Sequence, residues 1–176
     1  MLRLSRPLVD GLGTAVRLGL AAVFLVSGAI KAIDPEQTRV AVGAYEVLAP
    51  ELVGPVASAL PLVELAVGTL LLLGVITRWV AVASAVLLVG LMAAVAQAWA
   101  RGLSIDCGCF GGGGPVAEGN TQYPLELARD AGILLLALWL VLRPRTALSV
   151  DGWLRADQPA TVGSSRSPGQ ISRRDV

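Results

Sequence analysis

Long blocks of hydrophobic residues, separated by short polar stretches, dominate the pattern of this chain. Each of four blocks is close to the ~20 residues that an α-helix needs to cross ~30 Å of hydrocarbon. The blocks run from Thr14 to Ile33, Val56 to Ile76, Trp79 to Ala100 and Pro124 to Leu142. The pattern therefore predicts an all-α polytopic membrane protein, folded as a bundle of four transmembrane helices.

The first block follows Arg3 and Arg6, as the apolar part of a signal peptide would. It is longer than the usual apolar region of such a peptide, and it carries Lys31 at its end. We therefore interpret it as a retained helix, preceded by a short cytoplasmic segment of residues 1–13.

Lysine and arginine near the helix ends predict the orientation, because cytoplasmic loops carry an excess of both. One side collects Arg3, Arg6, Arg17, Arg78, Arg143 and Arg145. The other side holds Lys31, Arg39, Arg101 and Arg129 among many acidic residues. We therefore expect both termini in the cytoplasm (N-in/C-in) and the loop 101–123 outside a plasma membrane.

Composition supports this picture and excludes other classes. Hydrophobic residues make up 55% of the 176 residues, charged residues 15%, and the mean hydropathy is +0.70, whereas soluble domains average about 25% charged residues. The net charge of +1 and the lack of a basic patch give no sign of nucleic-acid binding. Histidine is absent, so any chemistry must use Cys, carboxylates, Lys, Arg or Tyr.

The regions outside the spans have distinct compositions. Residues 14–145 form one predicted membrane domain, and the polar residues 146–176 have the composition of a disordered cytoplasmic tail. Val40 to Leu48 mixes apolar and charged residues, as in a short helix at the membrane interface. We expect small residues to let helix backbones approach closely; they are Gly19, Gly28, Gly68, Gly74, Ala81 and Ala85.

The strongest local signal is the run Cys107-Gly108-Cys109-Phe110-Gly111, followed by three more glycines. Cys107 and Cys109 are the only cysteines of the chain, and the predicted topology places them in the outer loop. A disulfide across one intervening residue closes a small, strained ring, and strained exposed disulfides exchange readily. The glycines permit unusual backbone angles and close approach of a partner.

Three interpretations of the cysteine pair remain open. They are thiol–disulfide exchange, an inert or local structural pair, and binding of a thiophilic ion such as Cu(I). Closing so small a ring removes little entropy from the unfolded chain, and a purely structural disulfide here would therefore add little stability. Two thiolates without histidine cannot complete a four-ligand zinc site. Asp106, next to Cys107, works against an easily ionised thiol.

Four ionisable residues are predicted at similar depth on the cysteine side: Lys31, Glu64, Arg129 and Asp130. Charges inside a bilayer are costly and need a partner or a task. Arg17, Phe24 and Lys31 recur at seven-residue spacing and so share one helix face. The cluster either fixes helix register through ion pairs or snorkelling, or stabilises a thiolate or a reduced quinone oxygen while Glu64 moves protons.

The Cys-Gly-Cys-Phe-Gly run, the pattern around Phe24, Gly28 and Lys31, Glu64, and the Arg129-Asp130 pair together resemble the MauE branch of the DoxX-like membrane proteins. The resemblance covers roughly Val16 to Leu142. It implies a four-helix membrane bundle of the methylamine-utilisation type, active in the maturation of a disulfide-rich periplasmic subunit beside a thioredoxin-like partner. DoxX and DoxD relatives are linked to thiosulfate and quinone oxidation.

The leading hypothesis is a thiol–disulfide oxidoreductase of the membrane. Cys107 and Cys109 cycle between dithiol and disulfide with an extracytoplasmic thioredoxin-like partner, with a quinone as an electron acceptor, and Gly108, Phe110 and Gly111 support the loop. The alternatives are a non-catalytic scaffold of a redox complex and a Cu(I)- or small-solute-handling membrane protein.

Overall fold

The computed structural model describes residues 6–108, 111–117, 119–144, 146 and 149–151. Their elements, in chain order, are α1 (Arg6–Ile33), α2 (Pro35–Ala44), α3 (Pro50–Leu73), α4 (Thr77–Ala100), β1 (Ile105–Asp106), β2 (Gly114–Pro115) and α5 (Tyr123–Leu142). The predicted Cys109, Phe110 and Arg145, and residues 152–176 of the predicted tail, lie outside the described residues.

The four predicted hydrophobic blocks all lie in long helices, α1, α3, α4 and α5. Within the described chain, three helical segments are long and apolar enough to cross a membrane: Val9–Ile33, Pro50–Leu73 and Thr77–Ala100. The protein is therefore membrane-embedded. Helix α5 has 20 residues and carries Glu126, Arg129 and Asp130 near its start, so its role as a fourth span stays a prediction.

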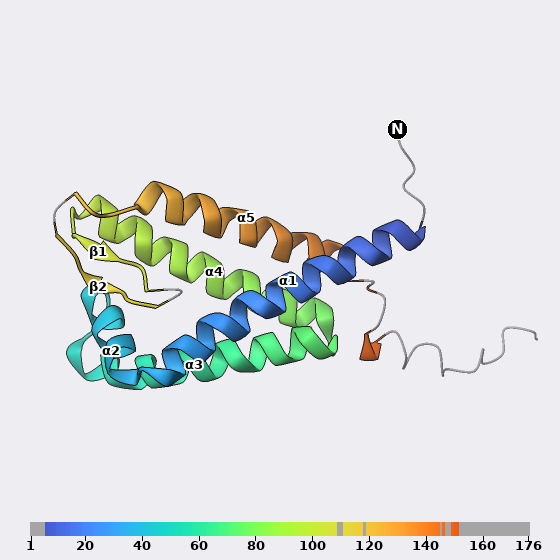
Figure 1. The fold of residues 1–176 in the computed structure, drawn as a ribbon, viewed down its shortest axis with the longest axis horizontal. Helices are drawn as coiled ribbons and strands as arrows, with labels where there is room; N and C mark the ends of the chain where they lie inside the picture. The colour runs from blue at the N-terminus through green and yellow to red at the C-terminus, as the bar shows by residue number, and fades with distance from the viewer. Residues whose placement is uncertain (1–5, 109–110, 118, 145, 147–148, 152–176) are drawn as a thin grey trace, which may run out of the picture.

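Two helix pairs build the bundle: α1 packs most extensively against α3, and α4 against α5 (Figure 1). Glycines allow the first contact, as predicted. A Cβ atom on Gly28 would lie 3.0 Å from Leu65 Cγ, and one on Gly68 would lie 2.8 Å from Leu25 Cγ. The prediction is wrong for Gly19, which faces open space, because its place on α1 meets no neighbouring backbone.

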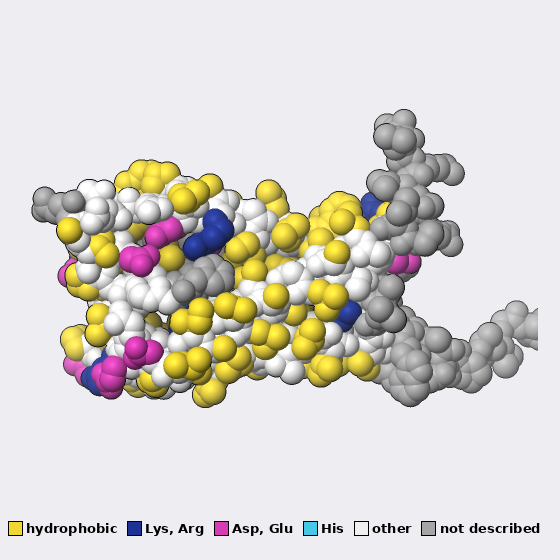
Figure 2. Space-filling view, in the orientation of Figure 1, with side chains coloured by type: hydrophobic (Ala, Val, Ile, Leu, Met, Phe, Trp, Pro, Cys, Tyr) yellow, Lys and Arg dark blue, Asp and Glu magenta, His cyan; other side chains and the backbone are white. Residues whose placement is uncertain are grey.

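The core lies between the two pairs, where Leu20, Phe24, Leu71 and Leu140 are buried. Large apolar side chains also cover the outside of the helices. Trp79 is 72% exposed and Leu135 is 67% exposed. Figure 2 shows this apolar surface along the bundle, with charged side chains gathered at the end that carries α2. Water solvates such a surface poorly, whereas lipid tails match it.

Helix α2 and the strands form one end of the molecule (Figure 1). The Asp34 side chain accepts a hydrogen bond from Gln37 N, and Pro35 follows, which is a favoured helix start. The helix predicted over Val40–Leu48 therefore begins and ends earlier, at Pro35 and Ala44. The predicted outer loop 101–123 contains one short antiparallel pairing, Ile105 with Pro115 and Asp106 with Gly114.

The opposite end is held by residues far apart in the sequence. Arg17 donates hydrogen bonds to the carbonyl oxygens of Leu71 (3.0 Å) and Leu72 (3.2 Å) at the end of α3. Asp151 accepts hydrogen bonds from the backbone of Ile76 and Thr77, each at 2.8 Å, at the start of α4. The tail predicted to be solvated from residue 146 thus begins by contacting the bundle.

Candidate functional site

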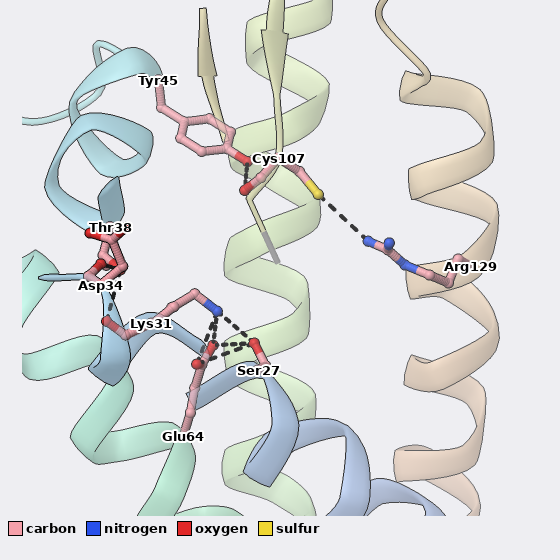
Figure 3. A network of polar contacts seen from close by, with 8 residues as sticks. All are labelled: Ser27, Lys31, Asp34, Thr38, Tyr45, Glu64, Cys107 and Arg129. Atoms are coloured by element: carbon pink, nitrogen blue, oxygen red, sulfur yellow. Dashed lines mark hydrogen bonds and ion pairs between the residues drawn. The ribbon is translucent and has the colours of Figure 1, made fainter. Parts of the chain in front are cut away.

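Cys107 lies directly after β1, and it is buried, with 8% of its surface exposed. The Tyr45 hydroxyl donates a hydrogen bond to the Cys107 carbonyl oxygen at 3.0 Å. Arg129 Nη2 donates to Cys107 Sγ at 3.6 Å, and the two side chains point toward one another (Figure 3). A guanidinium at a sulfur stabilises the thiolate form, which is the reactive form of cysteine.

Glycines fold the cysteine loop onto α2. Gly113 has φ +89°, and a Cβ atom there would lie 2.7 Å from both Ala41 Cβ and Gly108 Cα. Gln37 Nε2 donates hydrogen bonds to the carbonyl oxygens of Gly112 (3.2 Å) and Gly113 (2.6 Å). A side chain at Gly113 would force the loop off the helix, so glycine is required there.

Lys31 and Glu64 form a buried ion pair between α1 and α3. Lys31 Nζ lies 2.9 Å from Glu64 Oε1, and the two side chains are 11% and 12% exposed. Ser27 joins them, because its hydroxyl accepts from Lys31 Nζ at 2.5 Å and donates to the Glu64 carboxylate at 3.2 Å. Figure 3 shows the three side chains converging below Cys107.

Arg129 and Asp130 form a second ion pair on α5, with Nε 2.9 Å from Oδ1. The Asp130 side chain is 3% exposed, whereas that of Arg129 is 35% exposed. Asp130 Oδ2 is buried and has no hydrogen-bond partner among the residues that the structure describes. Such an oxygen favours a ligand or water that donates a hydrogen bond.

A cavity of about 370 Å³ joins these groups. Its apolar walls come from all four long helices and include Val23, Phe24, Leu60, Leu88, Leu91 and Ile133. Its polar lining includes Lys31, Glu64, Asp130 and Cys107, and α2 with the glycine loop closes one end. An apolar pocket of this volume with a few converging polar groups is typical of a small-molecule site.

The structure places the predicted residues as two separate ion pairs rather than as one four-charge cluster. Lys31, Glu64 and Asp130 line the same cavity, and Arg129 contacts the cysteine. Arg17 lies near the middle of α1 and contacts the end of α3, away from the cavity, although it shares a helix face with Phe24 and Lys31. Gly108 and Gly111, which were predicted to support the cysteine loop, line the cavity.

Sequence reasoning missed Ser27, Tyr45 and Glu126. Ser27 had a local signal, because it lies four residues before Lys31, and residues at this spacing are neighbours on a helix. Glu126 had the same signal, because it lies three residues before Arg129 and four before Asp130. Tyr45 had none, since only the folding of the chain brings it to Cys107.

The family model described as methylamine utilisation protein MauE matches residues 9–143. The chain belongs to the MauE family. The match contains every residue of the cavity and both ion pairs, so the site is part of the MauE region of the chain and the resemblance of the sequence to MauE is confirmed. No curated protein and no solved structure matches the chain.

Proposed function

We propose that this MauE protein is a membrane thiol–disulfide redox protein in which Cys107 and Cys109 exchange with a thioredoxin-like partner outside the cytoplasm. The observation that carries the proposal is the 3.6 Å contact between Arg129 Nη2 and Cys107 Sγ. A cation beside a buried sulfur favours the thiolate, whereas an inert structural cysteine needs no such neighbour.

The exchange conserves atoms and electrons. A thiolate of the partner attacks the Cys107–Cys109 disulfide, which forms a mixed disulfide and releases one cysteine as a thiolate. The second thiol of the partner then displaces the other cysteine. The partner is oxidised by two electrons to a disulfide, and the cysteine pair is reduced.

The proposed electron acceptor is a quinone in the 370 Å³ cavity, which Cys107 lines. The dithiol loses two electrons and two protons on becoming a disulfide, and a quinone takes up the same number on becoming a quinol. Lys31 Nζ is a donor suited to a quinone oxygen, and Asp130 Oδ2 is an acceptor suited to a quinol hydroxyl.

The proposed setting is a four-span bundle in the plasma membrane, with both termini in the cytoplasm and the cysteine loop outside. Helix α5 supplies the fourth span. Its exposed Leu135, Leu136, Leu138 and Leu142 give it an apolar outer face, which supports this role. Labelling from outside intact cells with a membrane-impermeant thiol reagent tests the orientation, and cysteines that react only after lysis would overturn it.

Trapping of the mixed disulfide tests the partner exchange. Single variants Cys107→Ser and Cys109→Ser, expressed in native membranes, are expected to retain a disulfide-linked partner on non-reducing gels. A matched control places one cysteine at the exposed Asn120 of the same loop in a cysteine-free chain. Capture by neither single variant, together with thiol labelling that never responds to redox conditions, would exclude the proposal.

The quinone step has its own test. Val23→Phe narrows the cavity, whereas Val26→Phe makes the same change on the exposed side of α1. In membranes, added quinone is expected to oxidise the cysteine pair in the parent chain and in Val26→Phe, and much more slowly in Val23→Phe. Equal rates in the two phenylalanine variants would remove the cavity from the electron path.

The other two hypotheses make different predictions. A scaffold would assemble normally with both cysteines changed to serine and would be disturbed by Glu64→Gln. A Cu(I)-handling protein would bind one ion per cysteine pair. The positive charge of Arg129 beside Cys107 Sγ disfavours a cation there.

A further inference from the structure

Two carboxylates lie beside Cys107 on the side away from the large cavity. Asp106, Cys107 and Glu126 bring two carboxylate oxygens and the sulfur within 4.8 Å of one another. Cys107 and Glu126 are each 8% exposed. Asp106, Glu126 and Arg129 also line a second hollow at this end of the bundle, whose other walls are Val116, Asn120, Gln122 and Leu125.

One oxygen of this group stands out. Glu126 Oε2 is buried and has no hydrogen-bond partner among the described residues. A buried carboxylate oxygen without a donor is costly. The cost of burying this oxygen falls if the carboxylate takes up a proton, and the nearby Cys107 thiol can supply one.

The charged and titratable groups around Cys107 come from several elements. Arg129 contacts the sulfur from α5 and also pairs with Asp130. The hydroxyls of Tyr45 and Tyr123 bond to backbone groups of this loop, at the Cys107 carbonyl and at Leu103 and Ile105. Lys31 and Glu64 line the large cavity and neutralise each other as an ion pair. Among the described residues, the two carboxylates within 4.8 Å of the sulfur, Asp106 and Glu126, are the groups placed to exchange a proton with the thiol.

Of these two carboxylates, Glu126 is the better proton acceptor. Asp106 is only partly buried, whereas Glu126 is buried and offers the unpartnered oxygen. A metal ion is the other ligand that two carboxylates and a sulfur attract. Here the guanidinium of Arg129, 3.6 Å from the sulfur, repels a cation.

We infer that Glu126 and Cys107 share one ionisable proton, which the Glu126 carboxylate accepts when the thiol ionises for exchange. The S–H bond breaks, and the proton passes to Glu126 directly or through one water. In the partner exchange proposed above, a partner thiolate breaks the Cys107–Cys109 bond, and when Cys107 leaves as a thiolate the proton returns to its sulfur from Glu126. The site keeps a constant net charge during ionisation of the thiol, which suits a buried position.

This inference deepens the proposed function, because it concerns the same thiol, but its test measures ionisation and needs no protein partner. Failure to capture a partner would therefore leave it standing. Conversely, independent titration of the two groups would leave the redox proposal intact.

The experiment uses the full chain purified in nanodiscs with Cys109→Ser, so that Cys107 is the sole cysteine. The rate of alkylation by iodoacetamide, an uncharged reagent, is measured from acidic to alkaline pH. The measurement is repeated with Glu126→Gln and with Glu126→Asp. Asp10→Asn is the matched control, because it also removes a carboxylate but lies near the start of α1, at the end of the bundle away from Cys107.

Two coupled groups titrate in two steps that belong to the pair, with an interaction of about one pH unit or more. The parent and Asp10→Asn are expected to give two-step rate profiles, and Glu126→Gln a single step. At the pH of the upper step, Glu126→Gln reacts about tenfold faster, because the like charge is gone. Glu126→Asp keeps two steps. Superimposable profiles for Glu126→Gln and the parent would overturn the inference.

If the Glu126→Gln variant does not fold, a reciprocal measurement on a different variant tests the same inference. Coupling is mutual, so Cys107→Ser must change the titration of Glu126 by the same factor. Infrared difference spectra of the protonated carboxyl band follow that titration. A Glu126 titration that is identical with and without the Cys107 sulfur would overturn the inference by itself.

Discussion

Arg129 Nη2 lies 3.6 Å from Cys107 Sγ, although the two residues are 22 positions apart, Cys107 in the loop after β1 and Arg129 on α5. The contact links the cysteine loop to the first turns of α5. It also sets opposing influences on the sulfur, since the guanidinium favours a thiolate and the carboxylates of Asp106 and Glu126 oppose it.

Removal of this cation is expected to make Cys107 less reactive. With Cys109→Ser as background, Arg129→Gln is expected to lower the alkylation rate at neutral pH by about tenfold, the factor for ~1.4 kcal/mol of lost thiolate stabilisation. Arg101→Gln is the matched control, because Arg101 pairs with Glu46 at an exposed site of the same end. A rate unchanged by Arg129→Gln would remove the electrostatic role of this contact.

The buried pair Lys31–Glu64 is expected to behave as a unit. Lys31→Met or Glu64→Leu alone leaves a buried charge without its partner, which costs about 3–5 kcal/mol. The double variant Lys31→Met with Glu64→Leu is expected to cost less than either single change. Unfolding in mixed micelles measures these free energies.

The exposed pair Arg101–Glu46 serves as the reference for this comparison of single and double variants of Lys31 and Glu64. Its side chains are 46% and 58% exposed, so its coupling is expected to be about 0–1 kcal/mol. Additive effects of Lys31→Met and Glu64→Leu would show that the buried pair is no more coupled than this surface pair, contrary to the expectation.

Gly68 and Gly19 form a matched pair of helical glycines. Alanine is intrinsically better than glycine within a helix by about 1 kcal/mol, so Gly19→Ala, which meets open space, is expected to be neutral or stabilising. Gly68→Ala places its Cβ 2.8 Å from Leu25 Cγ, so overpacking of about 1–3 kcal/mol is expected. Thermal unfolding in nanodiscs compares them, and equal melting temperatures would contradict the close contact of α1 with α3.

Asp151 is expected to stabilise the start of α4 from a distance. Ile76 precedes the helix with φ +43°, and no side chain of its own caps the first turn. Asp151→Ala removes both acceptors for the N–H groups of Ile76 and Thr77 and is expected to cost about 1 kcal/mol. Denaturant unfolding measures this cost.

Ile76→Gly provides the complementary test at the same turn. Glycine adopts a positive φ without the steric cost that a β-branched side chain carries. We expect this change to leave stability equal or higher, whereas Asp151→Ala lowers it. A large loss in Ile76→Gly would show that the Ile76 side chain, rather than the backbone angle, matters at this turn.

The long helices and the cysteine loop follow from local pattern. An unbroken apolar run of about 20 residues has few alternatives to a helix in a bilayer, since each backbone polar group must be satisfied within the segment. Helix ends do not follow from this pattern. Helix α1 begins at Arg6 and α3 at Pro50, ahead of their apolar runs, because a helix continues through polar residues once the following turns are stable.

The sequence by itself determined which segments are apolar enough for a membrane, that the charges of Lys31, Glu64, Arg129 and Asp130 lie on the cysteine side, and that glycines surround the two cysteines. Only the tertiary structure decided which of these charges pair, that Tyr45 and Glu126 reach Cys107, and that one cavity is lined by Lys31, Glu64, Asp130 and Cys107. The physical reason is that hydropathy acts over a few residues of one helix, whereas pairing and burial depend on how helices rotate against each other, which side-chain packing fixes.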